Sequence, residues 1–331
     1  MKAVHPDVEA IIAAGRAAGA QPFEAMTVAD ARAAHAARRT THQLVPQPVS
    51  MRSDISVEGP GGAITLRVYR PSGVVADAVL PCLVFIHGGG WILGSLETHD
   101  GLCCHLANGA ACCVISVDYR LAPEHPYPAA IDDCVAAYRA VVADAENLRI
   151  DPARLAVGGD SAGGNLAAVL ALFGRDGDIP APIQQTLLYP VVDIDRELAD
   201  YIPNLPGMVI SGATMVHFRD HYTSNKADRA DWRASPLKAT SLAGLPPALV
   251  VTCGHDPLEE EGRAYAMRME AEGVRVTHLH LSDQTHGVAT MTKVVPTAVS
   301  ILDFVAANLR EVFAKSVGQR DVPAAPSSAA R

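Results

Sequence analysis

One segment of the sequence could carry a nucleophilic side chain. Residues 159–163 read Gly-Asp-Ser-Ala-Gly, directly after the apolar run Leu155–Val157 and directly before a helical pattern. A sharp turn between a strand and a helix exposes a serine hydroxyl, and small flanking residues let the backbone fold back on itself. A turn that packs a helix or binds phosphate is the alternative, but the segment has neither a Walker-type lysine nor a G-x-G-x-x-G pattern. We therefore predict that Ser161 is the nucleophile of an acyl-transfer reaction.

A second segment could present main-chain N–H groups to an anion. Residues 87–91 read His-Gly-Gly-Gly-Trp and follow the apolar run Leu80–Ile86. Three consecutive glycines let N–H groups point at a site with no side chain in the way. We expect the N–H groups of Gly88 and Gly89 to join that of Ala162, the residue after the nucleophile, in an oxyanion hole. A merely flexible loop is the alternative interpretation.

A serine nucleophile also needs a base and an acid, from loops at the C-terminal ends of later strands. Asp193 follows one apolar run and Asp256 follows the next, so the residues alone leave two candidates for the acid. The base should come last, in the chain order serine, acid, histidine. His286 lies past the last apolar run and precedes Gly287, a loop position that suits a general base.

We expect structural roles for four further histidines and for the cysteines. His278 and His280 lie in the last strand-like run, where surface or partly packed side chains are expected. His217 and His221 have the i, i+4 spacing of a metal pair, but a third ligand is not evident, so an exposed helix without metal is expected. An odd number of cysteines in apolar segments, without CxxC spacing, indicates reduced core thiols. These are Cys82, Cys103, Cys104, Cys112, Cys113, Cys134 and Cys253.

Short apolar runs alternate with helical patterns over most of the chain, which indicates a parallel sheet covered by helices on both faces. Two earlier strands, at Ser50–Glu58 and Ala63–Tyr69, flank a Gly-Pro-Gly-Gly turn and predict an antiparallel hairpin. Together they give an eight-stranded, mostly parallel sheet. The apolar runs are Leu80–Ile86, Cys113–Val117, Leu155–Val157, Thr186–Val192, Ala248–Thr252 and Val274–Leu281, the last alternating like an edge strand. The helical patterns include Ala129–Val142, Gly163–Phe173, Glu259–Glu272 and Val295–Phe313.

Two segments outside this rhythm predict a helical cap over one end of the sheet. Residues 1–45 are Ala-rich and helical, with Thr27 and Asp30 as a helix-start signal. Residues 193–243 form a long polar stretch before a helical piece, which is typical of a lid or an inserted subdomain. The two parts of the core are then residues 46–192 and 244–315, and the Pro-, Ala- and Ser-rich residues 316–331 are expected to be disordered.

Composition limits the class of protein further. The chain has 331 residues, of which 49% are hydrophobic and 19% charged, enough for one large or two ordinary domains. The 27 basic and 36 acidic residues leave a net charge of −9, which argues against nucleic acid or an anionic membrane as a partner. Charges and glycines interrupt the Ala-rich start, so we expect no membrane span, no signal peptide and a cytoplasmic location.

Taken together, these motifs resemble those of the hormone-sensitive-lipase-type carboxylesterases, the bacterial family IV esterases of the α/β-hydrolase fold. The resemblance implies that Asp256, rather than Asp193, is the acid. It also implies a helical cap from residues 1–45 and about 193–240, and a homodimer through the edge strand 274–281. The stretches that carry it are residues 87–91, 118–130, 159–164, 234–237, 256–258 and 286–287, with residues 5–8 similar to the start of the cap.

We therefore expect a serine ester hydrolase that needs no metal or cofactor and acts on short to medium acyl chains. Ser161 would attack the ester carbonyl, His286 would take its proton, and Asp256 would orient the histidine. An amidase, or a hydrolase of specialised esters, lactones or carbamates, is the alternative, followed by a non-catalytic ligand receptor. Four residues are expected to line the acyl or alcohol pocket or, equally, to pack in the core: Trp91, Leu205, Met208 and Val288.

Overall fold

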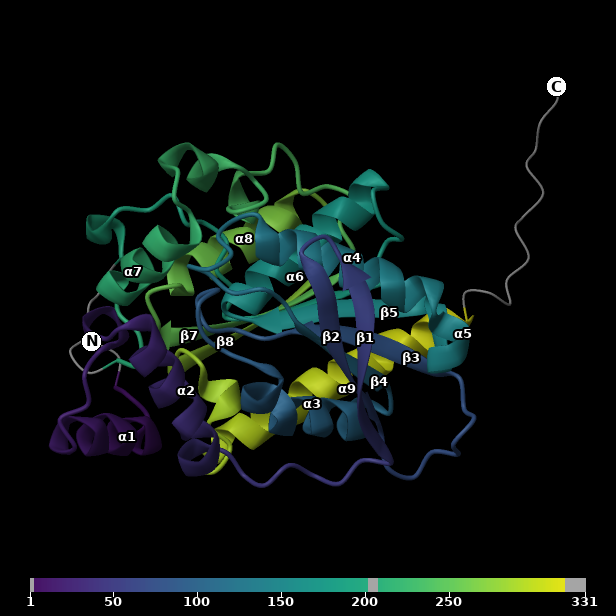
Figure 1. Cartoon of the computed structure of the whole chain (residues 1–331), viewed down its shortest axis with the longest axis horizontal. Coiled ribbons are helices and arrows are strands. Elements are labelled where there is room, and N and C mark those ends of the chain that lie inside the picture. The colour runs from purple at the N-terminus through teal and green to yellow at the C-terminus, as the bar shows by residue number, and fades with distance from the viewer. Residues whose placement is uncertain (1–2, 202–207, 319–331) are drawn as a thin grey trace.

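An eight-stranded sheet crosses the middle of the molecule in the computed structural model, which describes residues 3–201 and 208–318 (Figure 1). The strand order is β1-β2-β4-β3-β5-β6-β7-β8. β2 pairs antiparallel with β1 and β4, whereas the other neighbours pair in parallel. The strands are β1 (Met51–Gly59), β2 (Gly62–Arg70), β3 (Leu80–Ile86), β4 (Cys113–Asp118), β5 (Ile150–Asp160), β6 (Gln185–Leu188), β7 (Ala248–His255) and β8 (Val276–Thr285). The predicted mostly parallel sheet with its early hairpin is confirmed.

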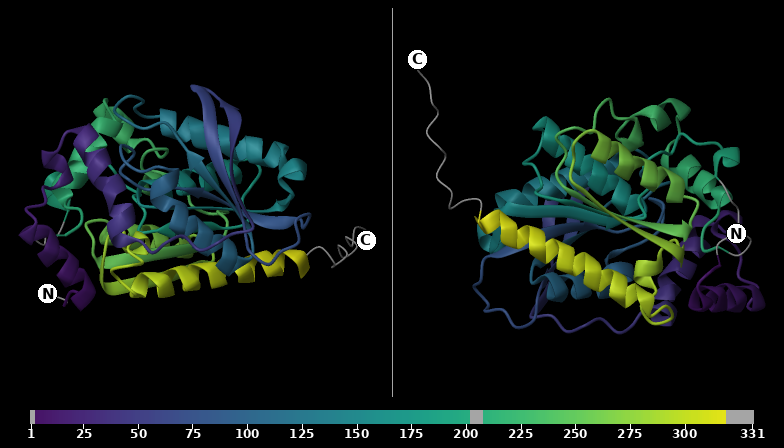
Figure 2. Two further views of the ribbon diagram at one scale, coloured as in Figure 1. Left: turned by 60° about the horizontal axis from the view of Figure 1, so that its bottom comes forward. Right: turned by 180° about the vertical axis from the view of Figure 1, so that it is seen from behind.

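Helices cover both faces of this sheet (Figure 2). The helices are α1 (Pro6–Ala17), α2 (Val28–His42), α3 (Leu96–Ala110), α4 (Ala129–Ala143), α5 (Ala145–Leu148), α6 (Ala162–Asp176), α7 (Gly212–Tyr222), α8 (Glu259–Ala271) and α9 (Thr297–Gly318). α3 and α9 pack on one face, with Leu83 and Phe85 of β3. α4, α6 and α8 cover the other face, with Val84 and Ile86. Because both faces are buried, β3 has a continuous apolar sequence rather than an alternating one.

Some boundaries differ from the sequence prediction. β6 ends at Leu188 rather than at residue 192, because Tyr189 has a positive φ of 36° and Pro190 has no N–H to donate to a ladder. α3 is not among the helical patterns for which the prediction gives bounds, although Ser95 and Thr98 form a reciprocal capping box at its start. α9 continues to Gly318, so the expected core boundary at residue 315 falls inside that helix.

Helices α2 and α7 lie at the same end of the sheet (Figures 1 and 2). Thr27 caps α2 as predicted, since its Oγ1 accepts the N–H of Asp30 at 3.1 Å. The carboxylate of Glu24 accepts hydrogen bonds from Ser211 and Thr214 at the start of α7, at 3.2 and 2.7 Å. The two segments that the sequence assigns to a cap are therefore tied to each other.

Candidate active site

Ser161 lies at the turn between β5 and α6, where the motif places it. Its φ of 55° and ψ of −120° are unusual for a residue with a side chain, and its N–H is held by the carbonyl of Leu188 at 2.9 Å. Gly163 has to be glycine here, because a Cβ would collide with the carbonyl oxygen of Ile86. Ser161 is 7% exposed, so its hydroxyl reaches the pocket while most of the turn is shielded from water.

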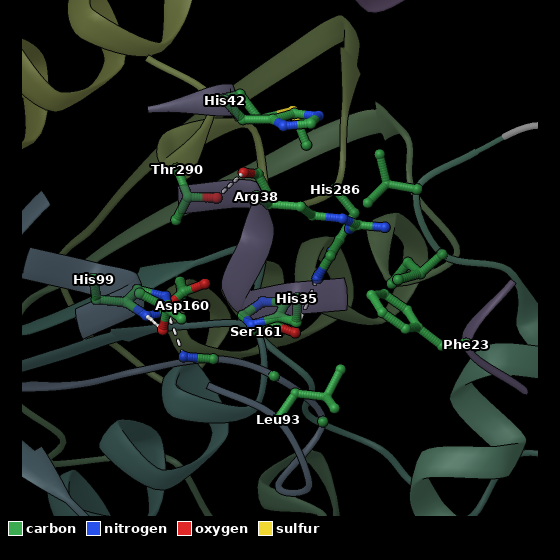
Figure 3. A pocket seen from close by; sticks show the side chains of 18 of the residues that line it. Phe23, His35, Arg38, His42, Leu93, His99, Asp160, Ser161, His286 and Thr290 are labelled. Atoms are coloured by element: carbon green, nitrogen blue, oxygen red, sulfur yellow. Dashed lines mark hydrogen bonds and ion pairs between the residues drawn. The ribbon is translucent and has the colours of Figure 1, made fainter. Parts of the chain in front are cut away.

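His286 and Asp256 complete a line of hydrogen-bonding groups with this serine, and Figure 3 shows His286 pointing at Ser161. His286 Nε2 lies 2.9 Å from Ser161 Oγ, and His286 Nδ1 lies 2.7 Å from Asp256 Oδ2. The second oxygen of the carboxylate, Asp256 Oδ1, accepts the N–H of Leu258 at 2.9 Å. A carboxylate fixed in this way holds the proton on Nδ1 and leaves Nε2 as the acceptor for the serine proton. The structure thus brings the three predicted residues together.

Asp193, the other candidate for the acid, lies in a separate network. Its carboxylate accepts the N–H of Asp195 at 3.0 Å and lies 3.8 Å from Lys238 Nζ. Its own N–H, like that of Val192, donates to the buried Glu261, whose pKa burial raises to about 8. Asp193 therefore organises the loop after β6.

Gly88 is held by Asp160, and this corrects the prediction for Gly88. The N–H of Gly88 donates to Asp160 Oδ1 at 2.8 Å, so it is not available to a substrate oxyanion. His99 Nε2 lies 3.0 Å from the same oxygen. Burial alone would raise the pKa of Asp160, but His99 and the Gly88 N–H outweigh it and hold that pKa below its ordinary value. An ionised Asp160 thus anchors the glycine loop to the turn that carries Ser161.

The next two glycines face the pocket. Gly89 and Gly90 have φ values of 124° and 59° and line the pocket together with the serine. A Cβ at Gly89 would collide with the carbonyl of Leu93, and one at Gly90 would collide with the ring of Phe218. The loop therefore brings bare backbone to the site, and we expect the N–H groups of Gly89, Gly90 and Ala162 to be the oxyanion donors.

The pocket is lined by the cap as well as by loops of the sheet (Figure 3). α2 contributes His35, Arg38 and His42, which the sequence prediction missed because it treated residues 1–45 only as an Ala-rich cap. Their spacing of three and four residues, which places them on one helix face, was the available signal. The apolar lining residues are Phe23, Leu93, Val209, Ile210, Met215, Phe218 and Met291.

Of the predicted pocket residues, the three that the structure describes do not line it. Trp91 is fully buried and stacks on Tyr222, with ring centres 4.3 Å apart. Val288 is also fully buried, in the core cluster that includes α9. Met208 lies beside the pocket residue Val209 without lining the pocket, and Leu205 is outside the described residues. Trp91 and Val288 thus correct the pocket assignment, and core packing is the interpretation that holds for them.

The histidines with other predicted roles do not line this pocket. His278 and His280 both contact Thr252 Oγ1, at 2.8 and 3.0 Å, beside the edge of the sheet. His217 and His221 lie on α7 with ring centres 4.4 Å apart. Within residues 3–201 and 208–318, no group of three or more His, Cys, Asp or Glu side chains could hold a metal ion. The seven cysteines are buried and unpaired, as expected.

Comparisons with known proteins agree on one family for this chain. Residues 83–290 match the sequence profile of a protein family that is described as having the alpha/beta hydrolase fold. The carboxylic ester hydrolase LipN of Mycobacterium tuberculosis (strain ATCC 25618 / H37Rv) is 44% identical over 241 residues, which cover 71% of this chain and 63% of LipN. The chain thus matches less than two thirds of that relative's length. The ethyl acetate hydrolase of Pseudomonas putida is 35% identical over 301 residues, covering 89% of this chain and 95% of that protein.

A solved structure extends the likeness to nearly the whole chain. The ester hydrolase EH1AB1 from the metagenome of Lake Arreo, solved with a derivative of bipyridine phosphonate, superposes with a TM-score of 0.89 at 40% sequence identity. The match covers 94% of this chain and 99% of that one.

Proposed function

The chain belongs to the α/β-hydrolase family, in its hormone-sensitive-lipase-like branch, and from this premise we propose that it is a serine carboxylic-ester hydrolase. The observation that carries the proposal is the line from Asp256 through His286 to Ser161, with contacts of 2.7 and 2.9 Å. A non-catalytic receptor would not need this complete arrangement. The relatives named above are ester hydrolases, which favours an ester over an amide, lactone or carbamate.

The geometry supports a two-step hydrolysis through an acyl-enzyme. His286 Nε2 takes the proton of Ser161 as its Oγ attacks the ester carbonyl, and Asp256 stabilises the resulting imidazolium. The carbonyl oxygen becomes an oxyanion at the N–H groups of Gly89, Gly90 and Ala162. The C–O bond to the alcohol then breaks, and His286 returns the proton to the leaving oxygen. His286 then takes a proton from a water whose oxygen attacks the acyl carbon; the bond from that carbon to Ser161 Oγ breaks, and His286 returns the proton to Oγ as the acid leaves.

The lining of the pocket supports short to medium acyl chains. Phe23 and Phe218, with ring centres 5.9 Å apart, close the cap side of the pocket together with Met215. Each added CH₂ buried against such a wall contributes up to about 0.8 kcal/mol. A wall formed by a folded cap also limits how many groups the pocket accepts, so longer chains should lose this gain.

We place the protein in the cytoplasm. The support comes from the cysteines, which are all buried and form no disulfide, as is usual in a reducing compartment. Separately, no helix in the part of the chain that the structure describes is long and apolar enough to cross a membrane.

We also propose a homodimer in which two copies pair along β8. β8 is an edge strand, and Ala248 of β7 donates its N–H to the carbonyl of Arg275 at 2.9 Å. In a parallel ladder this register turns the N–H of Val276 away from β7, toward a second strand. The N-terminal segment contacts the far end of β8, where His5 donates to the carbonyl of Asp283 at 2.9 Å.

The proposed function is tested with Ser161→Ala and p-nitrophenyl esters of increasing chain length. Removing the nucleophile should abolish the initial burst of p-nitrophenol and the steady turnover. At most a background rate roughly 10³-fold above uncatalysed hydrolysis in water should remain, because the oxyanion hole is still present. Ser224→Ala, at an exposed serine, is the matched control and should keep wild-type kinetics. Near-normal turnover in Ser161→Ala would reject this serine as the nucleophile.

A further inference from the structure

α2 turns three basic side chains toward the catalytic pocket. His35, Arg38 and His42 lie on one face of this helix and line the same pocket as Ser161 and His286 (Figure 3). Polar groups withdrawn from water cost free energy unless they find a partner. A pocket that received only hydrocarbon chains would gain nothing from such a face.

Arg38 carries the permanent charge on this face. Its guanidinium carbon lies 4.6 Å from the centre of the Phe23 ring. Burial lowers the pKa of Arg38, and within the described residues no carboxylate forms an ion pair with its guanidinium. The acidic residue that lines the pocket, Asp160, already binds the N–H of Gly88 and lies 3.0 Å from His99.

Two neighbours on α2 show how arginines behave when their role is structural or merely hydrated. Arg32 donates to both oxygens of Glu124 at 2.7 Å and to the carbonyl of Ile92 at 2.8 Å. Arg39 is exposed at the surface. Arg38 has neither the carboxylate partner of Arg32 nor the exposure of Arg39. Its charge is therefore partly buried without a carboxylate from the described part of the chain, which favours binding of an anionic ligand.

The two histidines beside Arg38 add donors without adding charge at neutral pH. Burial, followed by the charges of His99 and Arg38, lowers the pKa of His35 to about 3. Burial and Arg38 also lower the pKa of His42. The face therefore carries one positive charge flanked by neutral imidazoles, which suits a single negative group.

We propose that the preferred substrates are esters that carry a second, ionised carboxylate, and that Arg38 binds this carboxylate. The inference rests on the proposed ester hydrolysis and adds its substrate class. A planar guanidinium presents paired N–H donors that match the two oxygens of a carboxylate. The carboxylate belongs either to the acyl part, as in a half-ester of a dicarboxylic acid, or to the alcohol part, as in an acylated hydroxy acid.

The test compares each anionic ester with its neutral carboxamide analogue. One arm uses monomethyl esters of dicarboxylic acids from succinic to adipic acid, and the other uses O-acetyl esters of hydroxy acids. In at least one of the two arms, the wild type should hydrolyse the anionic ester with a kcat/KM about 10- to 100-fold higher than that for its carboxamide analogue. Most of this difference should come from a lower KM. Arg38→Gln should bring this ratio close to one and Arg38→Lys should keep part of it, whereas the matched control Arg39→Gln should keep the wild-type ratio.

Two results would overturn the inference while the proposed function stands. The first is a wild type that hydrolyses p-nitrophenyl butyrate but shows a ratio near one in both arms. The second is an Arg38→Gln variant that lowers the rates with anion and amide equally, because Arg38 would then act only on the fold of the cap. A wild type that hydrolyses no ester at all, neutral or anionic, would instead refute the proposed function itself.

Discussion

A serine in this site depends on the backbone as much as on its side-chain partners. The positive φ of Ser161 costs on the order of 1–3 kcal/mol for a residue other than glycine. The turn persists because the carbonyl of Ser161 accepts the N–H groups of Asn165 and Val191, at 3.0 and 3.2 Å, while its own N–H binds Leu188. None of these bonds uses the hydroxyl, so the serine can be truncated without loss of the turn.

The acid can be identified by exchanging each aspartate for asparagine. Asp256→Asn should lower kcat by about 10⁴-fold, because an amide at this position favours the wrong histidine tautomer. Asp193→Asn is the matched control, since Asp193 contacts Lys238 and Asp195 rather than His286. Steady-state kinetics on one p-nitrophenyl ester would measure both. A larger loss in Asp193→Asn than in Asp256→Asn would contradict the geometry.

The glycine loop should respond to a single methyl group. Gly89→Ala should lower kcat more than it raises KM, because a Cβ would collide with the carbonyl of Leu93 and displace an N–H group used in the transition state. Gly73→Ala is the control: Gly73 also has a positive φ, 78°, but no atom lies within 4 Å of its Cβ position. It should cost some stability and leave kcat unchanged. If Gly89→Ala changed KM alone, the loop would be a binding element only.

For single residues, the sequence predicts the roles of side chains better than the roles of main-chain N–H groups. Ser161 is identified by its motif, Asp256 by the family resemblance, and His286 by chain order, because each side chain belongs to a recognisable stretch of the sequence. Gly88 could not be separated from Gly89 in this way. Its N–H is taken by a carboxylate 72 residues further on, and no local pattern reveals that partner.

At the scale of elements, α2 is both a cover and a wall of the site. Ala31 packs on the core, and His35 and Arg38, one and two turns further along the same helix face, line the pocket. Its position is fixed at the start by the Thr27 cap and along its length by the bonds from Arg32 to Ile92 and Glu124.

Acid should weaken the packing of α2. The pKa of His35 is about 3 in the fold, because of burial and then His99, Arg38 and His87, with Asp160 opposing them. An unfolded histidine titrates near 6.5, so between about pH 6.5 and 3 the unfolded chain binds a proton that the folded chain does not. The free energy of unfolding should therefore fall as the pH falls through this window. His35→Gln should reduce that slope in urea unfolding measured from pH 7 to 4.

Part of the slope should remain in that variant, because burial also lowers the pKa of His87 to about 4. His125→Gln, at an exposed histidine, is the control and should keep the wild-type slope. An His35→Gln variant with the same acid dependence as His125→Gln would show that His35 is not held neutral by the fold.

The type of an element was predictable wherever its burial requires a continuous run of apolar residues in the sequence. β3 and β7 are buried on both faces, and their apolar runs stand out. The end of β6 was not predictable, because the run of apolar residues continues past Leu188 while the backbone leaves the sheet at Tyr189. The bounds of α3 were not predicted, because its buried face mixes cysteines with polar residues such as His99 and Asp100.

At the scale of the whole molecule, the pocket lies beyond the carboxyl ends of several strands, whereas the proposed pairing runs along the length of β8, which ends at Thr285 just before His286. The pocket is built from α2, α7 and the loops after β3, β5 and β8. Pairing along the edge of β8 would leave the glycine loop, which follows the central strand β3, away from the second copy. Dimerisation is therefore expected to act on stability and to leave the chemistry of Ser161 within one chain.

The edge of β8 allows a matched pair of proline substitutions. Val276→Pro removes an N–H that faces away from β7, so it should turn the proposed dimer into a folded monomer. Thr277→Pro removes the neighbouring N–H, which in this register donates toward Ala248 of β7, so it should destabilise the chain itself. Light scattering at micromolar concentration would give the mass of each variant, and thermal melting its stability. A wild type that is monomeric under these conditions would refute pairing through β8, since both substitutions would then act on the fold alone.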